Sequence, residues 1–264
     1  MGETSIELVC LRGQALHQLE RHMEAIEWLH KCLDINPDHT DAIRFLGRAL
    51  MKVDRFSEAA RCFKSVAESE PRNSRIRTLL GECLLRVGDF EEAERVLQAA
   101  IDLDHSQHEA HAHLANVQAA LGLTEAPLRS YLTALRLRPN DLNYRRQLGF
   151  LLIEQGYLPK AEHCFRLVLR QEAYNVDAIA GLATVLAKMG DPEGALSLAE
   201  PMIKTGADHP DLAHIYASLC RKLGKPNDAI PVLERLLGRS RPLATRSQLL
   251  HALGELHESA GNHD

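Results

Sequence analysis

The sequence predicts an all-α protein, an α-solenoid of about 7.5 helical hairpins. Three observations lead to this fold class. The chain repeats itself every 34 residues, the apolar residues of each repeat follow helical spacing, and Gly, Asp and Pro recur where the hairpins turn. A period of this length is typical of stacked helical units, because each unit buries its apolar face against its neighbours.

Small residues mark the 34-residue period most clearly. Alanine occupies one position of the period in six of seven repeats, and Pro127 occupies it in the remaining one. The six alanines are Ala25, Ala59, Ala93, Ala161, Ala195 and Ala229. A second position holds Gly13, Gly47, Gly81 and Gly149, with alanine in the other repeats. Antiparallel helices approach closely only where neither presents a bulky side chain, so we expect Gly47 and Ala59 to be such contact points.

Each repeat is expected to contain two helices. The seven full repeats should cover residues 6–39, 40–73, 74–107, 108–141, 142–175, 176–209 and 210–243. In the second of them, Ile43, Leu46 and Leu50 recur at the spacing of one helix face, and Phe63 and Val66 lie on the face of the next helix.

Turn residues separate these helices. Within a repeat, short segments such as 87–91 place a glycine at the left-handed cap and an acidic residue at the start of the next helix. Pro37, Pro71 and Pro139 end the second helix of their repeats. Residues 244–264 follow a three-residue insertion and should form the first helix of an eighth repeat or a capping helix. The sequence therefore predicts a single array over residues 1–264.

These residues resemble the tetratricopeptide repeat (TPR) family. The second repeat carries the family's pattern best, with Leu46-Gly47, Ala59, Phe63 and Pro71 in the expected order. The large first-helix Trp of the family is replaced in every repeat, for example by Ile43 and by Arg77, while the period is kept. The resemblance covers residues 6–261 and implies a right-handed superhelix that holds a partner in its concave groove.

The resemblance also implies which side chains line that groove, namely positions 2, 5, 6, 9, 12 and 13 of each repeat. The basic members are Arg44, Arg48, Lys52, Arg75, Arg86, Arg146, Arg221 and Lys222. The apolar and amide members that we assign to the partner-binding groove are Phe45, Leu79, Phe150, Asn116, Asn143 and Gln147. Cys10 and Gln14 stand where the family's carboxylate clamp has its first Lys and Asn, so that specialised clamp is not predicted. A basic groove favours an acidic protein or peptide partner. The alternative interpretation is that these basic side chains form an ordinary solvated helix face, with Asp41 and Glu7 nearby.

Composition excludes several other function classes. The chain has 31 Lys and Arg against 36 Asp and Glu, a net charge of −5, which disfavours nonspecific nucleic-acid binding. Its apolar runs are too short to span a membrane, and its first residues lack a secretion signal. Six scattered cysteines are typical of a reducing compartment, so we predict a cytoplasmic protein in which they act as small buried hydrophobes.

No catalytic motif is present, so the chain is predicted not to be an enzyme and to need no cofactor. No metal site is predicted either. His105, His108 and His111 are weak candidates as ligands, because His108 and His111 share a helix face. The alternative interpretation is that they fill ordinary repeat positions.

The sequence leaves three hypotheses about function. The first is a non-enzymatic scaffold that binds a peptide or protein segment in the concave groove. The second is that the chain is the N-terminal, substrate-recruiting region of a larger enzyme, since it looks like the repeat arrays of bacterial sulfotransferases and glycosyltransferases. Self-association through an apolar C-terminal edge is a third and weaker one.

Overall fold

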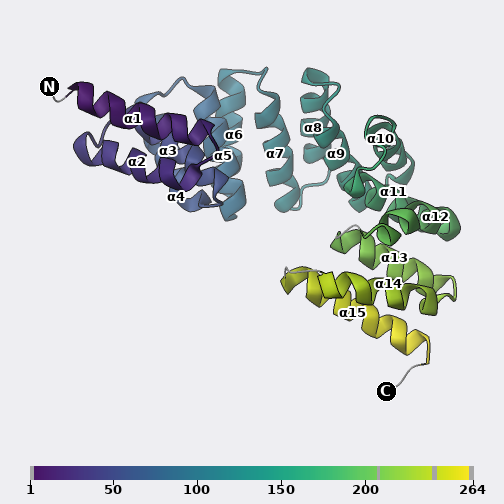
Figure 1. Cartoon of the computed structure of the whole chain (residues 1–264). Coiled ribbons are helices and arrows are strands. Elements are labelled where there is room, and N and C mark those ends of the chain that lie inside the picture. Colours follow the sequence, from purple (N-terminus) through teal and green to yellow (C-terminus); the bar gives the residue numbers. More distant parts are fainter. Residues whose placement is uncertain (1–2, 207–208, 240–242, 262–264) are drawn as a thin grey trace. The chain divides into compact units, whose positions relative to one another are not determined.

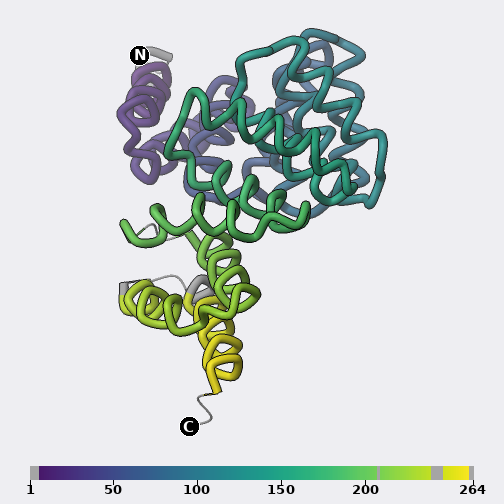
Figure 2. Tube along the Cα trace, turned by 90° about the vertical axis from the view of Figure 1, so that its right-hand side faces the viewer, coloured from purple at the N-terminus to yellow at the C-terminus, as the bar shows by residue number. Residues whose placement is uncertain are grey.

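A computed structural model of the chain describes residues 3–206, 209–239 and 243–261. The secondary structure of these residues consists of 15 α-helices joined by short turns (Figure 1). Contacts divide the chain into two compact units, Met1–Asn140 and Asp141–Asp264. The all-α prediction is confirmed, and in each unit the chain reverses direction at successive helix ends (Figure 2).

The first unit contains four hairpins. Its helices are α1 (Glu3–Gln18), α2 (His22–Ile35), α3 (Thr40–Lys52), α4 (Phe56–Ser69), α5 (Ser74–Val87), α6 (Phe90–Leu103), α7 (His108–Ala120) and α8 (Glu125–Leu137). Each helix packs against the next one along the chain, and the first helices of neighbouring hairpins also touch, α1 with α3 and α5 with α7. The first helices of this unit therefore share one face.

The second unit contains three hairpins and a final helix. Its helices are α9 (Leu142–Glu154), α10 (Leu158–Gln171), α11 (Val176–Lys188), α12 (Pro192–Lys204), α13 (Pro210–Lys222), α14 (Pro226–Arg239) and α15 (Leu243–Ser259). First helices touch in this unit too, α9 with α11 and α11 with α13. The α-solenoid architecture is confirmed, and six of the first helices begin at the residues where the period places the start of a repeat.

The glycines on first helices make room for large side chains of the second helices. A Cβ atom at Gly47 would lie 2.9 Å from Cζ of Phe63, and one at Gly81 would lie 2.4 Å from Cγ of Leu97. Ala59 is fully buried, as expected of a close contact. The sequence analysis did not identify Phe63 as the side chain that fills the space beside Gly47.

A left-handed residue ends the first helix in several hairpins. Gly88 has φ 92° and Gly156 has φ 78°, whereas Glu20, at the equivalent position of the first hairpin, has φ 61°. A non-glycine residue pays a steric penalty in this region of about 1 kcal/mol. Replacing Glu20 with glycine should therefore raise the free energy of unfolding by about 0.5–1 kcal/mol, after the entropy cost of glycine in the unfolded chain.

Chemical denaturation of the full chain measures this effect. Gly88→Ala is the matched opposite substitution, because it places a Cβ at an equivalent left-handed residue whose surroundings are open, and it should destabilise the chain. A Glu20→Gly variant no more stable than the parent would contradict the strain argument.

The final helix turns its apolar residues inward. Leu249, Leu253 and Leu256 are buried, while Ser247, Glu258 and most other exposed side chains of the described part of α15 are polar. Leu250, with 56% of its surface exposed, is the exception. A capping helix and the first helix of an eighth repeat both stay predictions for this segment. Self-association through this edge stays a prediction.

Candidate functional site

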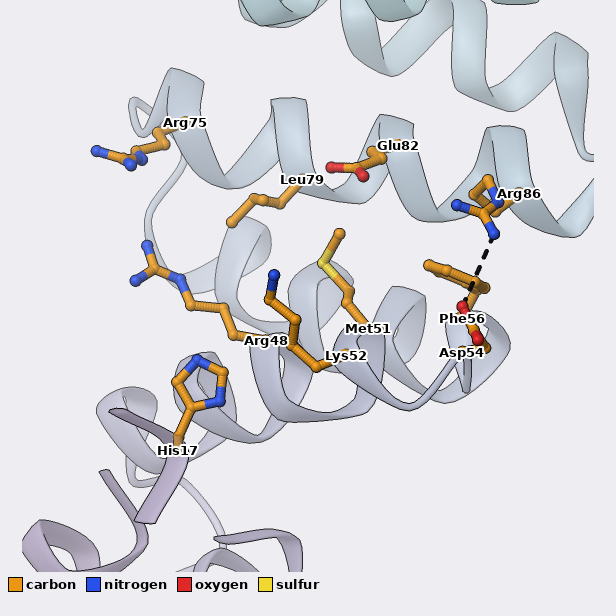
Figure 3. A pocket seen from close by; sticks show the side chains of 10 residues that line it. All are labelled: His17, Arg48, Met51, Lys52, Asp54, Phe56, Arg75, Leu79, Glu82 and Arg86. Carbon is orange, nitrogen blue, oxygen red and sulfur yellow. Dashed lines mark ion pairs between the residues drawn. The ribbon is translucent and has the colours of Figure 1, made fainter. Parts of the chain in front are cut away.

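The first helices of the N-terminal unit line a cavity of about 360 Å³. Five of the predicted groove residues lie on it: Arg48, Lys52, Arg75, Leu79 and Arg86. His17, Met51, Asp54, Phe56 and Glu82 complete the lining. Figure 3 shows Arg48 on α3 and Arg75 on α5 reaching toward the same end of the cavity, with Lys52, Met51 and Leu79 beside them.

Two further cavities adjoin this one. One, of about 540 Å³, shares His17, Arg48 and Lys52 with it and adds Phe45. The other, of about 350 Å³, shares Arg75, Leu79 and Glu82 and extends to α7. Because the three cavities share their walls, they form one trough across α1, α3, α5 and α7, which we call the N-terminal groove.

Three cations of the first cavity carry no internal countercharge. Arg48, Lys52 and Arg75 form no ion pair with any residue that the structure describes. The two carboxylates on the cavity wall have other neighbours, since Asp54 lies 3.7 Å from Arg86 and Glu82 lies 3.6 Å from His113. The cavity therefore holds an excess of positive charge that an acidic ligand would neutralise.

The pKa shifts reflect the same excess. Burial, followed by the charges of Arg75 and Arg44, lowers the pKa of Arg48. Burial also lowers the pKa of His17, and the neighbouring His22, Arg48 and Lys52 lower it further. The Nδ1 atom of His17 is buried without a hydrogen-bond partner among the described residues. The free groove thus disfavours additional protons and favours an anion.

Aromatic rings support two of the groove arginines. The guanidinium of Arg86 lies 4.2 Å from the centroid of the Phe56 ring, and that of Arg48 lies 5.9 Å from the Phe45 ring. Such contacts hold a cation in place and leave its hydrogen-bond donors available to a ligand.

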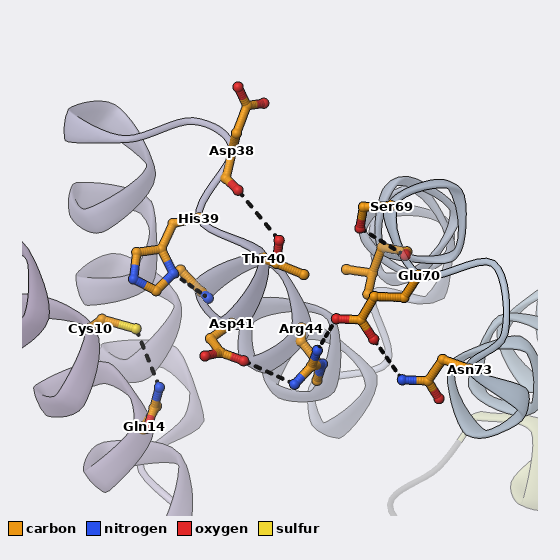
Figure 4. A network of polar contacts seen from close by, with 12 residues as sticks. Cys10, Gln14, Asp38, His39, Thr40, Asp41, Arg44, Ser69, Glu70 and Asn73 are labelled. Atoms are coloured by element: carbon orange, nitrogen blue, oxygen red, sulfur yellow. Dashed lines mark hydrogen bonds and ion pairs between the residues drawn. The ribbon is translucent and has the colours of Figure 1, made fainter.

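Arg44 differs from its predicted role because two carboxylates already hold it. Its guanidinium donates to Asp41 at 2.9 Å and also pairs with Glu70, which in turn accepts a hydrogen bond from Asn73 (Figure 4). Arg44 does not line the three cavities of the N-terminal groove. Its contacts join α3 to the end of α4, so its visible role is structural.

The predicted basic residues of the second unit are also paired, with one exception. The guanidinium of Arg146 lies 2.5 Å from a carboxylate oxygen of Asp177 and donates a hydrogen bond to the amide oxygen of Asn143. The guanidinium of Arg221 lies 3.2 Å from a carboxylate oxygen of Glu255. Lys222 is exposed and makes no ion pair with a described residue. The excess charge expected along the whole array is therefore concentrated in the N-terminal groove.

The remaining predicted groove residues mostly make internal contacts. Asn116 accepts a hydrogen bond from the Tyr131 hydroxyl, and Phe150 packs edge-on against Phe165 with ring centroids 5.1 Å apart. Gln147 is half-buried on α9. The contacts of Asn116 and Phe150 each tie a first helix to the second helix of the same hairpin.

The three candidate metal-binding histidines have separate neighbours. The Nε2 atom of His111 lies 3.3 Å from the carbonyl oxygen of His105. The Nε2 atom of His108 lies 3.2 Å from a carboxylate oxygen of Glu109. His108 lines the N-terminal groove, and His111 lines a different cavity between α6, α7 and α8. Within the described residues, these three do not form a metal-sized cluster.

Sequence reasoning missed several groove residues, although a signal for them existed. His17, Met51 and Glu82 occupy the same groove-facing positions as the predicted arginines, but the prediction selected mainly basic side chains. Phe56 begins a second helix and could not be identified from those positions.

Comparison with known proteins identifies the repeats. Sequence families described as tetratricopeptide repeat match three segments of the chain, residues 16–83, 54–121 and 180–201. DnaJ homolog subfamily C member 3 from Gallus gallus is 23% identical over 181 residues, which is 63% of this chain and 35% of that protein. Lipopolysaccharide assembly protein B from Haemophilus influenzae is 28% identical over 158 residues, 56% of this chain and 39% of that protein. The chain thus spans between a third and two fifths of these two relatives.

Solved structures agree in fold. A tetratricopeptide repeat protein from Parabacteroides merdae has a TM-score of 0.77 at 14% identity, covering 95% of this chain and 99% of that one. The Pseudomonas aeruginosa protein pilF has a TM-score of 0.66 at 18% identity, covering 80% and 96%. Among the described residues, none of the helices combines the length and the apolar character that a membrane-spanning helix requires. The repeat period, the paired helices and these matches together place the chain in the tetratricopeptide repeat family.

Proposed function

We propose that the chain is a non-enzymatic protein-interaction scaffold whose N-terminal groove binds an acidic peptide segment of a partner protein. The observation that carries this proposal is the set of three cations, Arg48, Lys52 and Arg75, that face a common cavity without internal ion pairs. Guanidinium and ammonium groups bind carboxylates through charge-assisted hydrogen bonds, which are stronger than neutral ones. Family membership supports the scaffold role, because these repeats generally serve as non-catalytic interaction modules.

The apolar part of the groove defines the expected peptide more closely. Met51, Phe56 and Leu79 lie on the same cavity wall as the cations. A peptide with an apolar residue next to acidic ones would bury its apolar side chain there while its carboxylates meet the arginines. A purely acidic segment would leave this apolar surface uncovered.

Peptide selection tests the proposal without assuming a partner. A random peptide library displayed on phage is panned against the immobilised full chain at moderate salt. We expect the recovered sequences to be enriched in Asp and Glu beside an apolar residue, and to lose binding as salt increases. Recovery of basic sequences, or of none that compete for a single site, would contradict the proposal.

His17 should make this binding depend on pH. An acidic ligand stabilises the protonated imidazole, so it raises the lowered pKa of His17 and binding takes up protons. Affinity should therefore increase about three- to tenfold as the pH falls from about 7.5 to 5.5, where peptide carboxylates remain ionised. The groups that face His17 are His22, Phe45, Arg48 and Lys52, and His22 is the only other histidine among them.

Anisotropy titrations across this pH range measure the effect. His17→Gln should remove most of the pH dependence, and His22→Gln serves as the comparison because its ring centroid lies 5.0 Å from that of His17. A full pH response in the His17→Gln variant would assign the proton to another group.

The cytoplasmic location and the membership of a larger enzyme stay predictions. A sulfotransferase- or glycosyltransferase-type catalytic domain beyond residue 264 has no specific support in the described residues.

A further inference from the structure

A cluster of soft metal ligands lies in the first hairpin, away from the N-terminal groove. The Sγ atoms of Cys10 and Cys32 and a ring nitrogen of His39 all lie within 4.8 Å of one another. Cys10 comes from α1, Cys32 from α2, and His39 from the residue that precedes α3. Both cysteines are buried and free, and His39 is half-buried. Figure 4 shows the side chains of Cys10 and His39, with the His39 ring beside the sulfur of Cys10.

From this juxtaposition we propose that Cys10, Cys32 and His39 form a binding site for a thiophilic d¹⁰ metal ion, with Zn²⁺ as the reference case. Two thiolates and one imidazole are the ligands that such ions prefer over hard cations such as Mg²⁺. Zn–S and Zn–N bonds of about 2.3 and 2.0 Å place tetrahedral ligands roughly 3.5–3.8 Å apart. The three ligand atoms therefore need to approach one another by at most about 1.3 Å.

The surroundings of the Cys10 sulfur suit a thiolate, whereas the Cys32 thiol donates a weak hydrogen bond to the carbonyl oxygen of Ile6 at 4.0 Å, which metal binding would replace. Gln14 Nε2 donates a hydrogen bond to Cys10 Sγ at 3.3 Å, and this donor would stabilise a negative sulfur. In the metal-free chain, burial and the neighbouring Cys10 raise the pKa of Cys32 to about 11, so this thiol holds its proton at neutral pH. Binding of Zn²⁺ would form two Zn–S bonds and one Zn–N bond and release one proton from each thiol.

One existing hydrogen bond opposes metal binding. The backbone N–H of Ala42 donates to Nδ1 of His39 at 3.2 Å, which caps α3 and leaves the hydrogen of the neutral ring on Nε2. A metal on Nε2 requires that hydrogen to move to Nδ1, so the cap bond must open. The loss of such a cap lowers the apparent affinity by about fivefold, a small factor beside the strength of zinc–thiolate sites.

The same chain supplies matched substitutions for each ligand. Position 39 corresponds to Asn73 and Asn175 in other repeats, and both cap the next helix by accepting from a backbone N–H. Position 32 corresponds to Ala100 and position 10 to Ala112, both buried. Each ligand can therefore be removed by introducing a residue that another repeat carries at the same position. The three variants are His39→Asn, Cys32→Ala and Cys10→Ala.

Titration of the full chain, reduced and freed of metal, tests the site with Cd²⁺ and Zn²⁺ alone. We expect one ion per chain, a near-ultraviolet sulfur-to-cadmium absorption band, two protons released per Zn²⁺, and a rise in Tm with metal concentration. Each of the three ligand variants should bind at least about 100-fold more weakly, whereas Cys62→Ser, outside the cluster, should bind like the parent.

Circular dichroism of each variant without metal establishes that it is folded. Failure of the reduced parent chain to bind one ion would overturn the proposal. So would undiminished binding by the Cys10→Ala and Cys32→Ala variants, because the ion would then lie on other ligands.

Discussion

Replacing Arg48, Lys52 and Arg75 together with glutamine should weaken binding of a selected acidic peptide by about 100-fold or more. Glutamine keeps much of each side chain's apolar stem and removes only the charge. A hydrogen bond to a charged group contributes about 1.5–3 kcal/mol, so three such losses readily exceed this factor. Because none of the three cations pairs with a described residue, their removal should leave the helical content unchanged. Fluorescence anisotropy at several salt concentrations measures both the affinity and its salt dependence.

A second triple variant removes the same charge from outside the N-terminal groove. Arg21, Arg55 and Arg95 are each paired with a glutamate three residues away, and they do not line the groove. Their replacement with glutamine should change the affinity by less than about twofold, since exposed ion pairs of this kind contribute little. Equal losses in the two triple variants would mean that net charge alone, and not the groove, governs binding.

The positions of the helices could be predicted because the evidence for them is repeated. The 34-residue period predicts the starts of six repeats, and a first helix begins at each of them. These residues are Thr40, Ser74, His108, Leu142, Val176 and Pro210. A wrong assignment of one turn would have shifted the start of that repeat away from the 34-residue period of the others. Contacts within a hairpin depend on residues close in sequence, so a local pattern specifies them well.

The sequence could not show which basic residues are paired, because some of the carboxylates that pair with them lie far along the chain. Arg44 pairs with Glu70 and Arg146 with Asp177, contacts that depend on the exact reach of two side chains on different elements. The sequence placed both arginines among the groove residues but not their carboxylates. It also treated Cys10 and Cys32 as separate hydrophobes, since their spacing is unlike that of a zinc motif, whereas the antiparallel packing of α1 and α2 brings their sulfur atoms together.

The largest loss of stability is expected from Phe165→Ala in the second unit. Phe165 on α10 is completely buried, and its ring fills the space beside two glycines of first helices, Gly149 and Gly181. A Cβ atom added at these glycines would lie only 2.7 and 2.3 Å from Cζ of Phe165. Since neither glycine has a side chain that could move into the void, the cavity should stay open and lower the free energy of unfolding by about 3–5 kcal/mol.

Other repeats of the chain provide the control for this prediction. Leu29 and Leu97 occupy the position of Phe165 in their repeats and pack against Gly13 and Gly81, so Phe165→Leu should cost less than half as much. Denaturant unfolding followed by circular dichroism measures both variants, and hydrogen exchange locates the effect. Protection should fall mainly in α9, α10 and α11, because a repeat array is stabilised by contacts between neighbours. A loss below about 1.5 kcal/mol for Phe165→Ala would show that α9 and α11 close around the void, and that their glycines are not held in place by the rest of the unit.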